Sequence, residues 1–228
     1  KKFINYLLSC NIGEVIVVFM GIMLALPLPL LPLQLLWMNL VTDGLPALAL
    51  GVEPYEPDIM KRKPRNPKER VLDRKSLEFV VIVGIVIAAM TLFMFYRELP
   101  DVARARTMAF TSLVVLEMTV ALSFRSPKYF FTREIAENKK LWLAVISSVI
   151  LQAMIVYVPF FNSIFDTVPL YAGDWISIFV AAFLIFMAIE VNKVLRLQRY
   201  IYDVRNIVMS PREESARSTS DDAGSLQL

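Results

Sequence analysis

The hydrophobic residues of this chain are concentrated in long blocks. Six blocks are predominantly apolar, and they cover residues of about 3–26, 29–51, 76–96, 106–124, 141–160 and 175–195. A helix of about 20 apolar residues is long enough to cross the ~30 Å hydrocarbon core of a bilayer. The pattern therefore predicts an all-α fold, a polytopic membrane protein with six transmembrane helices.

The positions of the basic residues predict the orientation of these helices. Basic residues gather between the second and third blocks, between the fourth and fifth, and after the sixth; they include Lys61, Arg62, Lys63, Arg65, Lys68, Arg70, Arg74, Lys75, Arg125, Lys128, Arg133, Lys139, Lys140, Lys193, Arg196, Arg199 and Arg205. On the opposite side, only the short connection around Arg97, Arg104 and Arg106 is basic. Because Lys and Arg accumulate in cytoplasmic loops, we expect both termini in the cytoplasm.

Composition supports a membrane protein and removes several kinds of chemistry. The chain of 228 residues is 57% hydrophobic, whereas soluble domains carry roughly 45–50% apolar residues. The lipid bilayer is the expected partner, and the net charge of +3 is too small to suggest nucleic acid. Cys10 is the single cysteine, so no intrachain disulfide can form, and no histidine is present to bind metal or exchange protons.

The chain divides into a membrane domain and a tail. Residues 1–200 contain all six blocks, and residues 201–228 form a cytoplasmic tail. From about Ser210 the tail is rich in Ser, Asp, Glu and Arg and has no apolar run, which predicts disorder. The first block has no small-residue cleavage site, so we expect no cleavable signal peptide.

Polar residues inside the spans are the candidate functional residues. An ionisable side chain within a spanning helix costs several kcal/mol, so it is a functional candidate by default. The candidates are Asn11 and Glu14 in the first span, Asn39, Thr42 and Asp43 in the second, and Glu117 in the fourth. In each of the first two spans the spacing places the polar residues on one face of the helix.

Carboxylate, amide and hydroxyl oxygens form a set of hard ligands. Such a set suits Ca²⁺ better than zinc or copper, which prefer nitrogen or sulfur. A simpler interpretation is that the amides and hydroxyls join helices through hydrogen bonds and that Glu117 pairs with a basic neighbour. No lysine or arginine lies deep within these three spans, however, so a bound cation is the natural partner of the acids.

The second span has a weak point in its backbone at the polar residues. Pro46 has no N–H and cannot bond to the carbonyl of Thr42, and Gly44 loosens the same turn. Carbonyls freed by unwinding of a membrane helix often coordinate ions. The alternative is an ordinary proline kink.

These residues resemble a known family. The run 34–47 (QLLWMNLVTDGLPA) resembles the sixth membrane helix of P-type Ca²⁺-transporting ATPases. The runs 11–14 (NIGE) and 116–118 (LEM) are similar to parts of the fifth and eighth helices, and residues 58–67 resemble the cytoplasmic loop after the sixth. The resemblance covers roughly residues 1–200 and implies the C-terminal transmembrane region of a type II, sarcoplasmic-reticulum-like calcium pump, family helices five to ten.

The resemblance also implies where the enzymatic chemistry lies. A pump of this family is an ATP-driven translocase that moves Ca²⁺ out of the cytoplasm, in a multi-pass membrane location (the cell membrane, if the source is prokaryotic). ATP and Mg²⁺ would act in cytoplasmic domains of the same pump. The phosphorylation motif Asp-Lys-Thr-Gly-Thr does not occur in this chain, so we expect no catalytic ATPase residues in it. Its partners would be the first four helices and the cytoplasmic domains.

The family's two Ca²⁺ sites can be carried over by position. The first would use Asn11, Glu14, Thr42, Asp43 and Glu117, and the second Asn39 and Asp43. The second would also need a glutamate and carbonyls from family helix four. Sodium–potassium pumps have Asp at the position of Asn39 and Gln at that of Glu117, which favours calcium here, while Mn²⁺ also accepts oxygen ligands.

Two other function classes are compatible with buried polar clusters in a membrane bundle. One is an independent channel or secondary transporter, and the other is a structural membrane subunit. For a calcium pump, the carboxylates crowded together after Ca²⁺ release would take up protons instead of staying ionised side by side. The expected function is therefore Ca²⁺ transport with proton counter-transport.

Overall fold

The computed structural model describes residues 2–52, 74–125 and 138–195, and these residues form helices and short connections without a strand. The helical segments are α1 (Lys2–Met23), α2 (Pro32–Trp37), the π-helix η1 (Met38–Thr42), α3 (Gly44–Gly51), α4 (Arg74–Arg97), α5 (Val102–Phe124), α6 (Lys139–Tyr157), α7 (Pro159–Phe165) and a last helix, Ala172–Leu195. The predicted tail 201–228, the basic residues between 61 and 70, and the family-like loop 58–67 lie outside the described residues.

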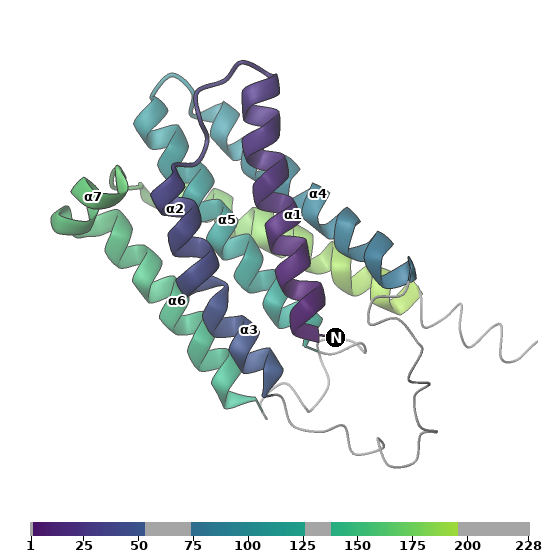
Figure 1. Cartoon of the computed structure of the whole chain (residues 1–228). Coiled ribbons are helices and arrows are strands. Elements are labelled where there is room, and N and C mark those ends of the chain that lie inside the picture. The colour runs from purple at the N-terminus through teal and green to yellow at the C-terminus, as the bar shows by residue number, and fades with distance from the viewer. Residues whose placement is uncertain (1, 53–73, 126–137, 196–228) are drawn as a thin grey trace, which may run out of the picture.

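The six predicted spans are confirmed. Six helical segments in the described part of the chain are long and apolar enough to cross a membrane, with α2, η1 and α3 together forming the second, Pro32–Gly51. The helix α5 is central, because 83% of its apolar stretch is buried whereas the others reach at most 44%. Figure 1 shows α5 in the middle of the bundle, and α1, α3, α4 and α6 all contact it.

Two glycines allow α1 and α4 to pack closely. A Cβ atom on Gly84 would lie 2.7 Å from Cγ2 of Ile12 and 3.0 Å from the carbonyl oxygen of Ser9. A Cβ atom on Gly13 would lie 3.2 Å from Cγ2 of Ile87. Small residues at such crossings let helix backbones approach within a membrane, so this contact fixes the position of α1, which carries Glu14.

The second span is bent into a π-helical turn and remains helical. The N–H of Asp43 bonds to the carbonyl of Met38 at 2.8 Å, five residues back, and the N–H of Ala47 bonds to the carbonyl of Asp43 at 3.0 Å. Pro46 follows the turn and cannot continue the normal ladder. The predicted weak point is therefore confirmed, but it takes the form of a π-turn, a feature common at functional sites.

Several helix ends differ by three or four residues from the predicted limits, and two of these differences have a clear local cause. Helix α5, which is the fourth predicted span, begins at Val102 and not near 106. Asp101 caps it by accepting a hydrogen bond from the N–H of Arg104 at 3.1 Å. Helix α6 ends at Tyr157, since Pro159 interrupts the chain and begins the separate helix α7. The sequence analysis predicts no helix between the blocks 141–160 and 175–195, so α7 is an element that it misses.

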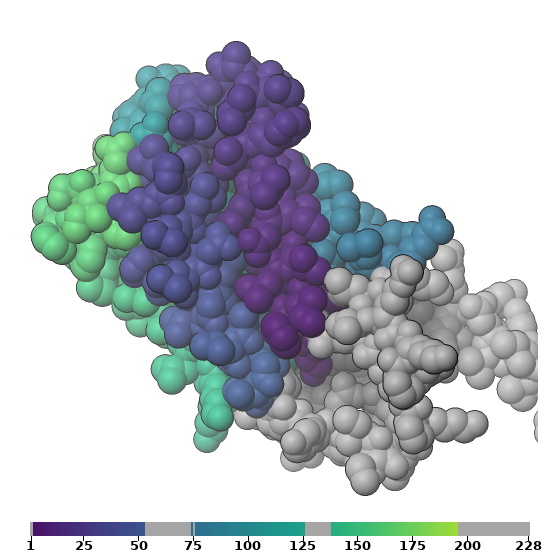
Figure 2. Space-filling model, viewed as in Figure 1, coloured from purple at the N-terminus to yellow at the C-terminus, as the bar shows by residue number. Residues whose placement is uncertain are grey.

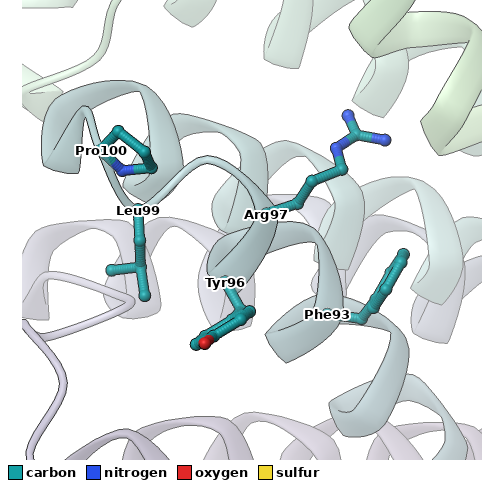
Figure 3. Close-up of a pocket in the computed structure, with 5 residues that line it drawn as sticks. All are labelled: Phe93, Tyr96, Arg97, Leu99 and Pro100. Atoms are coloured by element: carbon teal, nitrogen blue, oxygen red, sulfur yellow. The ribbon is translucent and has the colours of Figure 1, made fainter.

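The basic residues near the start of α5 are neutralised by acids. Nη2 of Arg104 lies 2.8 Å and 3.0 Å from the two carboxylate oxygens of Asp174, and Nη1 of Arg106 lies 2.6 Å from Oδ2 of Asp166. These pairs join α5 to the segment before and within the last helix. A hollow of about 590 Å³ lies at the same end of the bundle, where α4 turns towards α5, and Figure 3 shows its lining: Phe93, Tyr96, Arg97, Leu99 and Pro100.

Candidate cation site

One face of α1 is buried along its length and carries the polar residues that approach the centre of the bundle. Tyr6, Cys10 and Glu14 follow one another at intervals of four residues, so they lie on the same face. Tyr6 and Cys10 are fully buried and Glu14 is 4% exposed. This face packs against the second span and α5.

Asp43 follows the π-turn of the second span and is fully buried. The hydroxyl of Tyr6 donates a hydrogen bond to Oδ1 of Asp43 at 3.0 Å. The other carboxylate oxygen, Oδ2, has no hydrogen-bond partner among the described residues. Asp43 thus presents a free oxygen to the interior of the bundle.

Glu117 projects from the central helix α5 into the same region. It is fully buried, and neither of its carboxylate oxygens has a hydrogen-bond partner in the described part of the chain. Ligand atoms of Cys10, Asp43 and Glu117 all lie within 4.8 Å of one another. Three helices distant in sequence therefore converge on one point.

Glu14 and Asn39 form the next part of the site. The amide nitrogen of Asn39 donates to Oε2 of Glu14 at 2.6 Å and also to the carbonyl of Leu35 at 3.1 Å. The second oxygen of Glu14, Oε1, is buried and has no partner among the described residues. Glu14 and Asn39, which the resemblance assigns to different sites, are in direct contact here.

Thr42 is buried, but its polar groups are used within the protein. Its hydroxyl donates to the carbonyl of Met38 at 3.2 Å. Its carbonyl, which Pro46 leaves free, accepts a hydrogen bond from the hydroxyl of Ser148 on α6 at 3.5 Å. The freed carbonyl expected from the sequence is therefore present, with Ser148 as its partner.

Asn11 lies apart from the other candidates. It is exposed on the outer side of α1, where its amide nitrogen donates to the carbonyl of Leu7 at 2.7 Å. A spacing of three residues in a helix brings Asn11 and Glu14 to adjacent positions, but burial separates them: Glu14 faces inward and Asn11 outward.

Three buried carboxylates without a basic partner define the electrostatics of this site. No ion pair within the described residues joins Glu14, Asp43 or Glu117 to a lysine or arginine. An uncompensated carboxylate in a low-dielectric interior is costly. A divalent cation would supply both the missing charge and the missing ligand contacts, and oxygen ligands of this kind suit Ca²⁺.

Sequence reasoning missed two residues of this cluster. Tyr6 was not singled out, and Cys10 was considered only for disulfide formation. Both precede Glu14 by multiples of four residues, so the helical period placed them on the face of a residue already identified. That spacing was the available signal.

Among the described residues, six helices long and apolar enough to span a membrane surround buried carboxylates that form no ion pair with a lysine or arginine there. The chain is therefore a multi-pass membrane protein with a candidate intramembrane cation site. A family model described as "Cation transporting ATPase, C-terminus" matches residues 27–195. The chain belongs to that family.

Its relatives carry matching names. The chain is 44% identical over 182 residues to a "Calcium-transporting ATPase" of Bacillus subtilis (strain 168), which covers 78% of this chain and 20% of that protein. It is 35% identical over 171 residues to the human "Calcium-transporting ATPase type 2C member 1", covering 73% of this chain and 19% of the relative. The chain thus spans about a fifth of the length of these relatives, and the expected resemblance to calcium pumps is confirmed.

Proposed function

We propose that this chain is the ion-binding membrane half of an ATP-driven calcium pump that moves Ca²⁺ out of the cytoplasm. The observation that supports it most is a set of three buried acids, none of them paired with a base in the described structure. Asp43 and Glu117 converge with Cys10 on one point, and Glu14 follows Cys10 on the same buried face of α1. Relatives bearing the name calcium-transporting ATPase point to the same ion. ATP and Mg²⁺ belong, on this proposal, to other domains of the pump.

Two ions are expected, and Asp43 is the residue that serves both. Glu14, Thr42 and Glu117 with Asn11 would complete the first site, and Asn39 with Asp43 would begin the second. Occupation requires small movements, since the Tyr6 hydroxyl now holds one oxygen of Asp43 and Asn39 now donates to Glu14. Bound Ca²⁺ would replace the donors, and the amide of Asn39 would turn its oxygen towards the ion.

The partners we propose are further helices and the cytoplasmic domains of the same pump. Figure 2 views the face on which α1 and the Pro32–Gly51 span lie side by side. Asn11 and Asn39 are both exposed, each on one of these two segments. Amides facing lipid are unfavourable, whereas amides at a helix–helix contact form hydrogen bonds. Another helix packed there would cover Asn11 and bring it into the site.

Proton counter-transport is part of the proposal. When Ca²⁺ leaves, Glu14, Asp43 and Glu117 remain as buried acids in the interior of the bundle. Like charges and burial both favour the neutral acid, so protons would replace the departing cations. These protons would travel back as the site reopens to the cytoplasm.

The Asp43→Asn variant tests the proposal directly. The substitution keeps the size of the side chain but removes the charge shared by both sites, so Ca²⁺-dependent phosphorylation of the full-length pump by ATP should be lost. Asp174→Asn is the matched control, because Asp174 is also a buried carboxylate but pairs with Arg104. Normal Ca²⁺ activation of Asp43→Asn would refute the assignment.

A channel or a structural subunit would respond differently. Neither has an ATP-dependent phosphorylated state, so Ca²⁺ would not control phosphorylation in the wild-type protein at all. Observing that control in the wild type, and its loss in Asp43→Asn alone, separates the pump from both alternatives.

A further inference from the structure

Cys10 lies beside the carboxylates and has no part in the proposed calcium site. It is fully buried on α1, one turn before Glu14. Its sulfur and one carboxylate oxygen from each of Asp43 and Glu117 lie within 4.8 Å of one another. The three ligand atoms come from three separate helices, so the bundle itself brings them together.

The carboxylates next to Cys10 have free ligand atoms. Both oxygens of Glu117 and Oδ2 of Asp43 are buried and lack hydrogen-bond partners among the described residues. Glu117 and Asp43 are each fully buried. Two acids with unpartnered oxygens therefore lie beside the sulfur of Cys10.

Sulfur changes the kind of cation that these ligands accept. Ca²⁺ is a hard ion that takes oxygen ligands and gains little from sulfur. Thiolate is a soft ligand that favours thiophilic metals, and mixed sulfur and oxygen sets are used for them. The Cys10–Asp43–Glu117 group therefore offers such metals a ligand that calcium does not use.

The spacing of the three atoms is compatible with a single ion. Metal–sulfur bonds of about 2.3 Å and metal–oxygen bonds of about 2.1 Å in a tetrahedral arrangement put sulfur and oxygen about 3.6 Å apart. The observed limit of 4.8 Å leaves a closure of roughly 1 Å for the ion to induce. Rotation of the three side chains can supply a movement of that size.

We propose that Cys10, Asp43 and Glu117 form a mixed sulfur–oxygen site for a thiophilic divalent cation. The bound cation uses Asp43 and Glu117, which are also calcium ligands, and so prevents Ca²⁺ from binding. The inference rests on the proposed function, because the two metals share Asp43 and Glu117. Binding forms a metal–sulfur bond and releases the thiol proton, together with any proton that Asp43 or Glu117 holds before the metal ion arrives. The metal is not reduced or oxidised.

Cd²⁺ is the probe, and Cys10→Ser is the variant, since serine keeps the size of the side chain and replaces sulfur with oxygen. In the purified full-length pump, Cd²⁺ should produce the ultraviolet absorption of a cadmium–thiolate bond. That band should be weaker by one thiolate per molecule in Cys10→Ser, so the difference between the two proteins reports Cys10 even if other cysteines bind the metal. The Cd²⁺ concentration needed to displace radioactive Ca²⁺ should be about tenfold higher, or more, for Cys10→Ser than for the wild type.

The calcium affinity of Cys10→Ser should stay within about threefold of wild type, because Ca²⁺ does not use the sulfur. Identical cadmium spectra for the two proteins, or an unchanged displacement by Cd²⁺, would overturn the inference. If Cys10→Ser does not fold, Cys10→Ala serves in the same comparison, with retained Ca²⁺ binding as proof of folding. Absence of Ca²⁺ binding in the wild type would contradict the proposed function, while the spectrum, recorded without Ca²⁺, would still decide the role of Cys10.

Discussion

At the residue scale, the three buried acids differ in the hydrogen bonds they already have. Glu14 accepts one from Asn39 and Asp43 accepts one from Tyr6, whereas Glu117 accepts none from the described residues. Glu117 therefore carries the largest unmet demand for a positive charge. In a protein without bound ions, it should therefore take up a proton or else destabilise the fold.

Replacement of Glu117 by glutamine should therefore separate binding from folding. Glutamine has the shape of the protonated acid and, unlike the carboxylate, never places a charge in the interior, so the temperature of unfolding in the absence of Ca²⁺ should stay unchanged or rise. Loss of a charged ligand should weaken Ca²⁺ binding by about 100-fold. Hydrogen bonds to charged groups contribute roughly 1.5–3 kcal/mol, and we expect a loss of similar size here. Thermal unfolding without Ca²⁺ and equilibrium Ca²⁺ binding are the two measurements.

A purely structural Glu117 would give the reverse result. Its replacement would lower the unfolding temperature and leave Ca²⁺ affinity intact. Gln152→Leu is a control for packing around α5, because Gln152 is also fully buried and its amide donates to Thr111 at 3.2 Å, on α5. That change should destabilise the fold without weakening Ca²⁺ binding to the extent expected for Glu117→Gln.

The sequence predicted most of the candidate site at this scale because charged residues within apolar spans are rare and easily recognised. Glu14, Asp43 and Glu117 are identified in this way; the structure buries all three and brings Asp43 and Glu117 together. The direction in which Asn11 points was not predictable, since an amide at the edge of a helix face can turn either way. Cys10 was overlooked because its role depends on a sulfur lying near acids from two other helices.

At the element scale, the crossing of α1 and α4 determines where Glu14 and Cys10 lie. The Gly84→Ala variant should push the helices apart, because the added methyl group would lie 2.7 Å from the side chain of Ile12 and 3.0 Å from the Ser9 carbonyl. Overpacking of this kind costs about 1–3 kcal/mol. Thermal unfolding should occur at a lower temperature, and Ca²⁺ affinity should fall as α1 shifts.

Gly51→Ala is the control for this variant. No atom lies within 4 Å of a Cβ placed on Gly51, so alanine there should leave both stability and Ca²⁺ affinity close to wild type. Equal effects of the two substitutions would show that the close contact between α1 and α4 does not position the site.

The extent of the spans was predictable because it depends on the length of apolar runs, which the bilayer sets. Helix ends were less predictable. The start of α5 depends on the cap formed by Asp101, and α7 depends on Pro159 beginning a new helix. Both are local features that an average over about 20 residues conceals. The partner of the Thr42 carbonyl was likewise not predictable, because Ser148 lies on a helix distant in sequence.

At the scale of the whole molecule, one end of the bundle carries arginines that are paired with acids. At the end where α4 meets α5, Arg97, Arg104 and Arg106 pair with Glu98, Asp174 and Asp166. Their positive charge is therefore locally compensated. This explains how three arginines can lie on the side that the sequence assigned to the exterior, and the cytoplasmic position of both termini stays a prediction.

The central claim is that the carboxylates of this chain hold two transported Ca²⁺ ions. The most direct measurement is the number of Ca²⁺ ions bound per phosphorylatable molecule of the full-length pump, in the wild type and in Glu14→Gln. In Glu14→Gln, residue 14 keeps a side-chain oxygen to which the amide of Asn39 can donate, but it loses its negative charge. Four carboxylates, including the glutamate of family helix four, would balance the charge of two Ca²⁺ ions. We expect two ions for the wild type and a value approaching one for Glu14→Gln, whereas a wild-type value of one, or two ions in both proteins, would contradict the account.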